Sequence, residues 1–386
     1  MVSFVGSGMG FHGNQVALGW LAFDLTGDTR ALGFALFLNG FALVAGSLFG
    51  GVIADRFNRR NTIVGIQAIQ MGMAFLMALL VVFDALALWH LYLVSLFTGL
   101  VMSLAMPSRQ AFVYNLVGKK CLANAMALNM GTMNGMRLIG PAIAGVLIAW
   151  LGVESVYFLS GGGFLLSMAV ILFYVGPTKQ EYAPSRESPF RAMGEGFGYM
   201  WRHPRLFWMV MLAMGGAALG IPFRDLIPAF AVDALGQGPE GFGLLLSMVG
   251  LGALLGSVTV ASMASSRYRG LLVIGGGLGI GLFMIGLSFT GSLGVALVLF
   301  LVLGWVSTVF TTMMNIIIQM DVDDEFRGRM ASIYMVTFGV HPMGALGLGA
   351  VARETGIADA YMFAGLAMIG FLLFMVVWRK ELRSRF

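Results

Sequence analysis

Two neighbouring residues of opposite charge, Arg224 and Asp225, interrupt an apolar stretch between Pro222 and Pro228. Proline has no backbone N–H, so each of these prolines disrupts a helix. A discontinuous helix within a membrane normally lines a cavity, where it can bind a substrate or an ion. We therefore expect a functional site at Arg224 and Asp225, with an interfacial pair that snorkels outward as the alternative.

A histidine and an arginine also lie deep inside apolar stretches, at His341 and Arg137. An arginine at the centre of a bilayer costs about 2.5 to 3.5 kcal/mol on insertion scales, so Arg137 should face the protein interior or water. Histidine changes charge near neutral pH, which makes His341, like Asp225, a candidate proton carrier. The alternatives are structural: Arg137 bonds helix carbonyls or amides, and His341 is a satisfied imidazole at a kink before Pro342.

A cluster of charges closes another apolar stretch, between Gly51 and Arg60. Asp55 ends the stretch, and Arg56 and Arg59 follow it. A carboxylate at this place can accept hydrogen bonds from the N-terminus of a neighbouring helix, where the helix dipole favours negative charge. Anchoring at a membrane surface would by itself explain the arginines.

Composition determines the elements that must position these residues. Hydrophobic residues make up 59% of the 386 residues and charged residues 11%, whereas soluble domains carry about 25% charged residues. A spanning helix needs about 20 apolar residues, and backbone polar groups in lipid must be satisfied internally. We predict an all-α membrane protein with twelve transmembrane helices. Their approximate ranges are 2–23, 32–54, 62–83, 88–108, 124–150, 155–176, 206–230, 241–264, 270–289, 293–319, 329–351 and 360–378.

The positive charges alternate between the gaps that separate these ranges. Nineteen of the 23 Lys and Arg residues fall in alternate gaps, and loops rich in Lys and Arg face the cytoplasm. The pattern places the C-terminus in the cytoplasm and leaves only Arg30 and Arg353 in the outer gaps. The net charge of +5 is explained by these loops and by contact with anionic lipid rather than nucleic acid.

Glycines recur at fixed offsets along the chain, which indicates an internal repeat. The pairs are Gly33/Gly243, Gly40/Gly250 and Gly46/Gly256 at 210 residues, and Gly135/Gly339, Gly140/Gly344 and Gly145/Gly349 at 204 residues. We predict two pseudo-symmetric six-helix halves, 1–176 and 206–386. A cytoplasmic linker, 177–205, joins them and contains an interfacial helix near 190–201. Parallel repeats of this kind place a substrate site between the halves near mid-bilayer.

The same offsets add candidates to the site. The 210-residue offset places Asn14 and Gln15 at the positions equivalent to Arg224 and Asp225, and the 204-residue offset pairs Arg137 with His341. Acidic residues at membrane depth are scarce. Asp24 and Asp233, near the outer boundary, are therefore the next candidate proton carriers after Asp225.

The segment Gly51–Arg60 resembles the loop signature of the major facilitator superfamily. The run Arg137-Leu-Ile-Gly140-Pro141-Ala-Ile-Ala-Gly145 resembles the antiporter motif of its drug/proton antiporters. Three segments further resemble the branch with bacterial siderophore and macrolide exporters: 25–27, 107–111 and 324–329. The arginine that drug antiporters often bury in helix four is missing, because Arg109 lies at the cytoplasmic end of that helix instead.

The resemblance implies roles for two of these segments. It implies that Asp55 meets the N-terminus of helix 329–351 and pairs with Arg327 or Arg329, which closes the cytoplasmic side. We expect Asp323, Asp324 and Glu325 in the first turn of that helix. The pair Gly140–Pro141 is expected to break the hydrogen-bond ladder of its helix and to allow bending.

We therefore predict a multi-pass transporter of a bacterial inner membrane. It would export a small amphipathic molecule, such as a siderophore, a macrolide or another drug-like compound, by alternating access and proton antiport. We expect membrane lipid as a further partner, a functional monomer, no enzymatic activity, no cofactor and no metal. The alternatives are a lipid-handling or nutrient-uptake transporter of the same fold, and a non-transporting membrane scaffold or sensor. The first helix lacks preceding cations, so we expect further N-terminal residues in the native chain.

Overall fold

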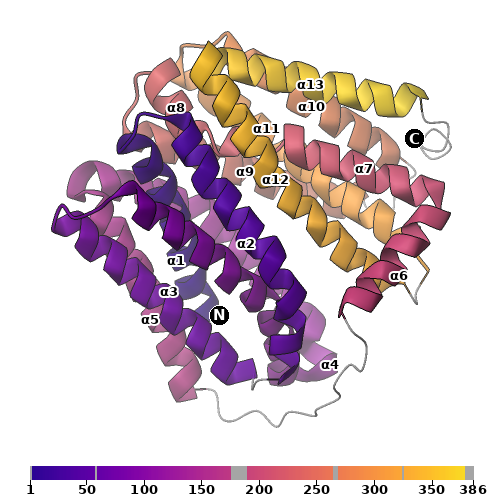
Figure 1. Ribbon diagram of the computed structural model, residues 1–386, viewed down its shortest axis with the longest axis horizontal. Helices are drawn as coiled ribbons and strands as arrows, with labels where there is room; N and C mark the ends of the chain where they lie inside the picture. Colours follow the sequence, from indigo (N-terminus) through magenta and orange to yellow (C-terminus); the bar gives the residue numbers. More distant parts are fainter. Residues whose placement is uncertain (1, 57–58, 175–188, 264–267, 324–325, 379–386) are drawn as a thin grey trace. The chain divides into compact units, whose positions relative to one another are not determined.

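The computed structural model in Figure 1 describes residues 2–56, 59–174, 189–263, 268–323 and 326–378. Within these ranges, side chains are not described at 47–59, at most positions of 106–138, at 189–193, at 327–329, at 331–338 and at 378. All regular secondary structure in the described ranges is helical, as the composition predicts.

The helices follow one another with short connections. In chain order they are α1 (Val2–Asp24), α2 (Thr29–Arg56), α3 (Arg59–Val82), α4 (Leu88–Leu151), α5 (Val153–Tyr174), α6 (Pro189–Arg202), α7 (Pro204–Leu219), η1 (Pro222–Arg224), α8 (Ile227–Ala229), η2 (Phe230–Ala234), α9 (Pro239–Met263), α10 (Arg269–Ser288), α11 (Leu293–Met320), α12 (Arg327–Thr355) and α13 (Ile357–Trp378).

Nine segments in the described part of the chain are long and apolar enough to cross a membrane. Of the other predicted spans, α1 has a lower mean hydropathy, whereas α12 and the second part of α4 include side chains that are not described and are therefore not counted over their full length. Two of these helices carry the polar candidates, with Asn14 and Gln15 on α1 and His341 on α12. Polar residues lower the mean hydropathy of α1, and the nine segments are a count over the described residues alone.

Helix α4 corrects one predicted boundary. It extends over 64 residues and so joins the predicted helices 88–108 and 124–150, because the predicted loop at 109–120 is helical as well. A helix of this length rises about 96 Å if straight, roughly three times the hydrocarbon thickness of a bilayer. The cations of this gap mark where the chain becomes polar, but Lys and Arg are good helix formers and do not end a helix.

Three prolines lie inside continuing helices, Pro107 and Pro141 in α4 and Pro342 in α12. α4 runs through Gly140 and Pro141, and α12 runs through Pro342. The predicted break of the ladder at Gly140–Pro141 therefore does not end the helix. The start of α12 also differs from expectation: its first residue is Arg327, so Asp323 precedes the helix instead of lying in its first turn.

The chain divides into two compact units, each with its own packing. The first comprises 1–27, 41–187 and 238–247, and the second 28–40, 188–237 and 248–386. In the first unit α1 packs against α4 and α5, and α3 packs against α5. In the second unit α12 packs against α7, and α10 packs against α11 and α13.

Glycine contacts within the units follow the sequence repeat. A Cβ added at Gly140 would lie 3.1 Å from the Cβ of His12 on α1, and its repeat partner Gly344 abuts the backbone of Ala218 on α7. Likewise Gly46 abuts Ser103 of α4, and Gly256 abuts Trp305 and Thr308 of α11. Small residues let helices approach closely, so the repeated glycines mark repeated helix contacts.

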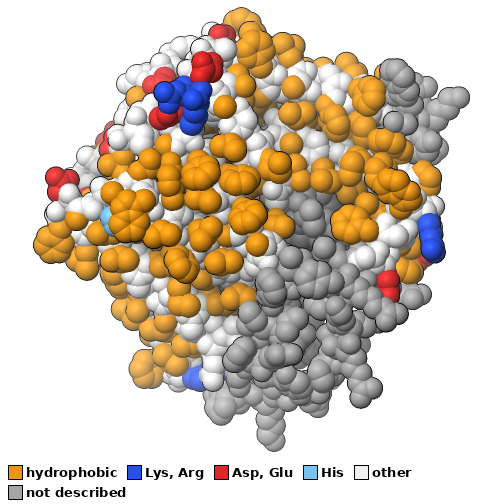
Figure 2. All heavy atoms as spheres, viewed as in Figure 1, with side chains coloured by type: hydrophobic (Ala, Val, Ile, Leu, Met, Phe, Trp, Pro, Cys, Tyr) orange, Lys and Arg blue, Asp and Glu red, His pale blue; other side chains and the backbone are white. Residues whose placement is uncertain are grey.

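Apolar side chains dominate the surface. Figure 2 shows hydrophobic side chains over most of the face in view, with few charged ones, which lie toward its margins. Large exposed residues include Leu76, Phe173 and Val258 on three different helices. Such a surface is far more apolar than a soluble protein presents and fits contact with lipid.

Candidate functional site

The region around Arg224 and Asp225 is a broken helix, as the two prolines predict. α7 ends at Leu219, and the Gly220 N–H donates to the Gly216 carbonyl at 2.8 Å. A single 3₁₀ turn follows over Pro222–Arg224, then the short pieces α8 and η2. Pro222 and Pro228 contribute no N–H, so the α-helical ladder cannot continue across them. The break places two charged side chains within an apolar span, Pro204–Ala234.

Asp225 and His341 meet at this break. The His341 Nε2 lies 2.9 Å from the Asp225 Oδ2, and the two side chains are 23% and 15% exposed. His341 comes from α12, one residue before Pro342. Sequence analysis named both residues as candidate proton carriers but did not predict their contact. The contact is an ion pair only when the imidazole is protonated.

Arg224 has a different partner. Its Nη2 donates to the Oγ of Ser307 on α11 at 3.1 Å, and its guanidinium lies 5.7 Å from the centre of the Phe223 ring. Consecutive residues do not share a face of a helical turn, so the two opposite charges do not simply neutralise each other. The Asp225 carboxylate is left to face His341.

A buried tyrosine holds the backbone of the same turn. The hydroxyl of Tyr361, on α13, donates to the Phe223 carbonyl at 2.7 Å. The ring of Tyr361 packs edge-on against Phe230 and Phe300, with centroids 5.2 and 6.4 Å apart. Sequence analysis missed Tyr361. The only available signal was a tyrosine early in an apolar helix, where a buried hydroxyl requires a partner.

On α1 the equivalent positions are less enclosed. Asn14 is half-buried, and its buried Oδ1 has no hydrogen-bond partner in the part of the chain that the structure describes. Gln15 and Asp24 are exposed. The repeat thus gives α1 an amide pair at the positions where the broken helix carries charge.

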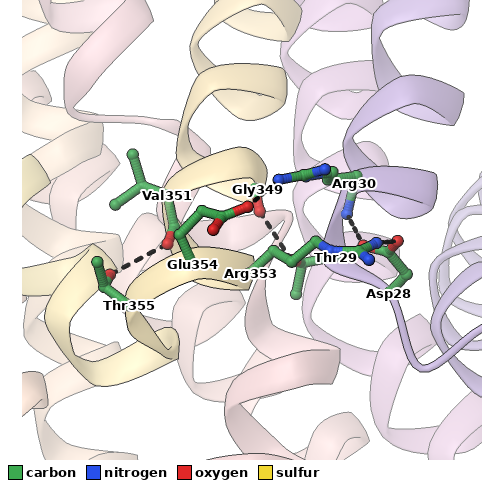
Figure 3. Close-up of polar contacts among 8 residues, drawn as sticks. All are labelled: Asp28, Thr29, Arg30, Gly349, Val351, Arg353, Glu354 and Thr355. Carbon is green, nitrogen blue, oxygen red and sulfur yellow. Dashed lines mark hydrogen bonds and ion pairs between the residues drawn. The ribbon is translucent and has the colours of Figure 1, made fainter.

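The start of α2 and the end of α12 form a polar contact. We call it the α2–α12 seam (residues 28–40 and 342–354). Figure 3 shows ion pairs between Asp28 and Arg353 and between Arg30 and Glu354. Between them the Thr29 hydroxyl donates to the Gly349 carbonyl at 2.7 Å. A Cβ at Gly33 would lie 3.2 Å from the Ala345 carbonyl oxygen, and Gly40 abuts Pro342.

Sequence analysis recorded Arg30 and Arg353 as the two cations of the outer gaps but did not pair them. A signal was present, because each stands beside an acid, Asp28 or Glu354. The seam extends from these exposed pairs to Pro342, the residue next to His341.

A second contact, the α4–α9 seam (residues 145–150 and 240–243), has a different character. A Cβ at Gly145 would lie 2.7 Å from the Gly243 Cα, and the reverse distance is also 2.7 Å. At the end of the seam the Trp150 indole N–H donates to a Glu240 carboxylate oxygen at 3.1 Å. Gly145, named from the antiporter-like segment, therefore lies at a close backbone contact.

Several predicted residues lie outside the described side chains. These are Gly51, Asp55, Arg56, Arg59, Arg137, Arg327 and Arg329. The contact between Asp55 and helix 329–351, and the relation of Arg137 to His341, therefore stay predictions. Of the loop arginines, Arg60 is described: its Nη2 donates to the Leu172 carbonyl of α5 at 2.9 Å.

The predicted helix of the linker is present as α6, and its end is bonded to the segment before α12. The Tyr199 hydroxyl donates to Asp323 at 2.9 Å, and the Tyr199 ring stacks on Phe326 with centroids 4.3 Å apart. Burial and the Asp323 carboxylate raise the pKa of Tyr199, so its hydroxyl stays protonated and donates. Nearby, Arg205 Nε lies 3.3 Å from an Asp321 oxygen. Sequence analysis had placed Asp323 in the first turn of helix 329–351.

Comparison with known proteins places the chain in a family. A family model described as "Transmembrane secretion effector" matches residues 2–384. The chain is 30% identical over 365 residues to the enterobactin exporter EntS of Shigella boydii serotype 18, covering 92% of this chain and 85% of the relative. The enterobactin exporter EntS of Escherichia coli O139:H28 matches with the same identity and coverage.

Solved structures share the fold at low sequence identity. The nucleoside transporter NupG is 16% identical with a TM-score of 0.76, and the match covers 100% of this chain and 98% of that one. A D-xylose–proton symporter is 14% identical with a TM-score of 0.74, covering 99% and 98%. With the match over almost the whole sequence, the chain belongs to the transmembrane secretion effector family within the major facilitator superfamily of multi-pass transporters.

Proposed function

We propose that this efflux transporter carries a small amphipathic molecule out of the bacterial cytoplasm in exchange for protons, by alternating access. The observation that carries the proposal is the Asp225–His341 contact of 2.9 Å at a helix break inside an apolar span. Siderophores, macrolides and related drug-like compounds are the proposed substrates. Relatives named as enterobactin exporters support the siderophore class.

The pair can couple protons to motion because its strength depends on protonation. A proton on His341 turns the contact with Asp225 into an ion pair, and loss of that proton leaves a neutral imidazole beside a carboxylate. The two residues come from different helices, the broken helix and α12. Protonation therefore changes how firmly these helices hold each other, which is what exchange of a proton for a substrate requires.

Substitution of either residue tests the coupling. We expect Asp225→Asn and His341→Gln to abolish uphill export of enterobactin, used as the probe, while downhill exchange persists because binding and rocking need no titrating group. Export by these variants should no longer respond to an uncoupler. His90→Gln is the matched control, since His90 Nδ1 bonds only the local backbone of Ala87 among the described contacts.

The outcomes separate three cases. Uncoupler-sensitive uphill export by both variants would place the proton carrier elsewhere, with Asp233 and Asp24 next to test. An uncoupler without effect on the wild type would refute proton antiport itself. If the protein exported none of the siderophores, macrolides and drug-like compounds tested, the proposed substrate class would be refuted.

The charged loop after α2 is proposed as the cytoplasmic gate. Asp55 would accept hydrogen bonds at the start of α12, with Arg327 or Arg329 as charge partners, and Gly51, Arg56 and Arg59 would shape and anchor the loop. We expect Asp55→Asn to lower export while leaving membrane insertion near normal. A fully active variant, or one that fails to accumulate, would refute the gate.

Arg137 is proposed to face the interior opposite His341 in the repeat. We expect Arg137→Ala to impair export more than Arg137→Lys, because lysine keeps the charge but loses the planar fork of donors. Equal loss of folded protein in both variants would instead indicate a structural role.

The proposed orientation places the linker and the C-terminus in the cytoplasm. Cysteines at Gln180 and Asp28, introduced in a Cys121→Ser background, should label from the cytoplasmic and the outer side respectively. The reverse labelling would refute the orientation. Blue-native electrophoresis tests the proposed functional monomer, and a dimer that persists in active protein would refute it.

A further inference from the structure

We propose that Tyr361 is a positioning residue for the Asp225–His341 pair. It would act by holding the broken helix in the one arrangement that brings the Asp225 carboxylate to His341. This inference rests on the proposed proton coupling, because it assigns the residue that sets how strongly that pair binds its proton.

Tyr361 makes its hydrogen bond to the broken helix from a fully buried position. Its side chain is fully buried, and its hydroxyl donates to the Phe223 carbonyl at 2.7 Å. Phe230 packs edge-on against the Tyr361 ring at an interplanar angle of 83°, and Phe300 does so at 75°. A ring held on two sides has little rotational freedom, so its hydroxyl has a fixed position.

The broken helix needs such a support. The 3₁₀ turn is closed by two backbone hydrogen bonds, from the Arg224 N–H to the Ile221 carbonyl at 3.2 Å and from the Asp225 N–H to the Pro222 carbonyl at 3.0 Å, and neither involves the Phe223 carbonyl. Within a continuous helix the Phe223 carbonyl would accept from the N–H four residues later. At the break Tyr361 supplies a donor instead. Because Phe223 precedes Asp225 by two residues, fixing its carbonyl fixes the backbone that carries the carboxylate.

The surroundings contain few groups that could replace this support. Arg224 and Tyr361 lie at the same break as the pair, and each has a partner of its own. Arg224 donates to Ser307 of α11, and α11 carries no titratable residue. Asp28, just before α2, and Arg30 of α2 are bonded to Arg353 and Glu354 at the far end of the α2–α12 seam. Arg205 of α7 pairs with Asp321.

The test removes the hydroxyl and keeps the ring. His341 is followed through its imidazole NMR signal in histidine-labelled protein in nanodiscs, and the signal is assigned by its loss in His341→Gln. We expect Tyr361→Phe to lower the titration midpoint by about half a pH unit or more, roughly a threefold loss of proton affinity, because Asp225 becomes free to move away. The pH dependence of enterobactin export in cells should shift in the same direction.

Tyr157→Phe is the matched control. Tyr157 is also fully buried, but its hydroxyl has no hydrogen-bond partner among the described residues. Its loss should leave the His341 midpoint unchanged. In an Asp225→Asn background Tyr361→Phe should likewise have no further effect, since the group being positioned is gone. Should Tyr361→Phe fold poorly, Phe230→Leu loosens the tyrosine ring without removing its hydroxyl and should shift the midpoint in the same direction.

The two proposals fail separately. A His341 midpoint that is the same in Tyr361→Phe and the wild type would overturn the positioning role, even if His341→Gln still uncouples export. An equal shift in Tyr157→Phe, or a shift that persists in the Asp225→Asn background, would also overturn it. Export that ignores an uncoupler in the wild type would refute proton coupling, and the titration would still decide whether Tyr361 positions Asp225.

Discussion

The two seams occupy equivalent places in the repeat but differ in chemistry. At an offset of 204 residues Trp150 corresponds to Glu354, and at 210 residues Arg30 corresponds to Glu240. The α2–α12 seam therefore has an arginine–glutamate pair, with a second ion pair beside it, where the α4–α9 seam has an indole–carboxylate hydrogen bond. Deeper in, the α4–α9 seam brings two glycines together.

The difference separates two ways of holding helices together. Exposed ion pairs contribute about 0.2 to 1 kcal/mol each and weaken with salt. Close backbone packing contributes through many small contacts that salt does not screen. We therefore expect the stability of the α2–α12 seam to depend on side-chain charge and that of the α4–α9 seam to depend on side-chain volume.

The largest expected effect comes from adding side-chain volume in the α4–α9 seam. Gly145→Val should destabilise the protein by about 3 kcal/mol, at the upper end of the range for overpacking, because its Cβ would meet the Gly243 backbone at 2.7 Å. The measurement is the fraction of monodisperse protein after heating in detergent. Gly162→Val is the control, since a Cβ there meets no atom within 4 Å. Equal stability of the two variants would refute the close contact.

A charge reversal should have an intermediate effect. Arg30→Glu brings two carboxylates together, and Glu354→Arg brings two guanidinium groups together, so each should lower the melting temperature and reduce export of enterobactin about two- to fivefold, as expected for about 0.4 to 1 kcal/mol. The double variant should recover because the pair is restored with its signs exchanged. The Arg30–Glu354 pair suits this exchange better than the Asp28–Arg353 pair. Asp28 also accepts a hydrogen bond from the Arg30 backbone N–H at 2.8 Å, and replacing Asp28 would remove that bond as well. No recovery would mean that the pair does not join the helices.

Salt should produce a smaller effect on the same seam. Raising ionic strength from about 0.1 to 1 M shortens the screening length from roughly 10 to 3 Å, which should lower the melting temperature of the wild type. The variant Arg30→Gln/Arg353→Gln has no pairs to screen and should show a smaller change. A salt response of equal size in both proteins would locate its origin outside the seam.

The smallest expected effect belongs to the end of the α4–α9 seam. Trp150→Phe removes the indole donor to Glu240 at 3.1 Å, and Trp150 is 76% exposed. We expect a loss of stability below about 0.5 kcal/mol, because water replaces the donor. A loss as large as that of Gly145→Val would show that the hydrogen bond, not the glycine contact, holds this seam.

Sequence reasoning captured what depends on local chemistry. Pro222 and Pro228 predicted the broken helix, and the apolar spacing near 190–201 predicted α6. The glycine offsets predicted an internal repeat, and the glycine contacts within the units follow these offsets. The loop predicted at 109–120 was wrong, because polarity there does not end a helix. Nine strongly apolar segments are counted in the described part of the chain, and α1 is not among them because its polar residues lower its mean hydropathy.

What could not be predicted depends on distant parts of the chain meeting. Asp225 and His341 were each selected for their depth, yet their contact joins positions 116 residues apart. Tyr361 and Phe223 are 138 residues apart, and Arg30 and Glu354 are 324 apart. The glycine offsets relate equivalent positions rather than partners, so they do not show which helix a side chain faces.

One helix, α12, supplies a residue to two of these three contacts, His341 and Glu354. α12 has 29 residues and rises about 43 Å, with Tyr199 stacked on Phe326 just before its start, His341 in its middle and Arg353 near its end. The contacts of α6, of Asp225 and of the α2–α12 seam are thus arranged along a single helix that continues through Pro342. Any displacement of α12 at His341 would have to be accommodated at both of its ends.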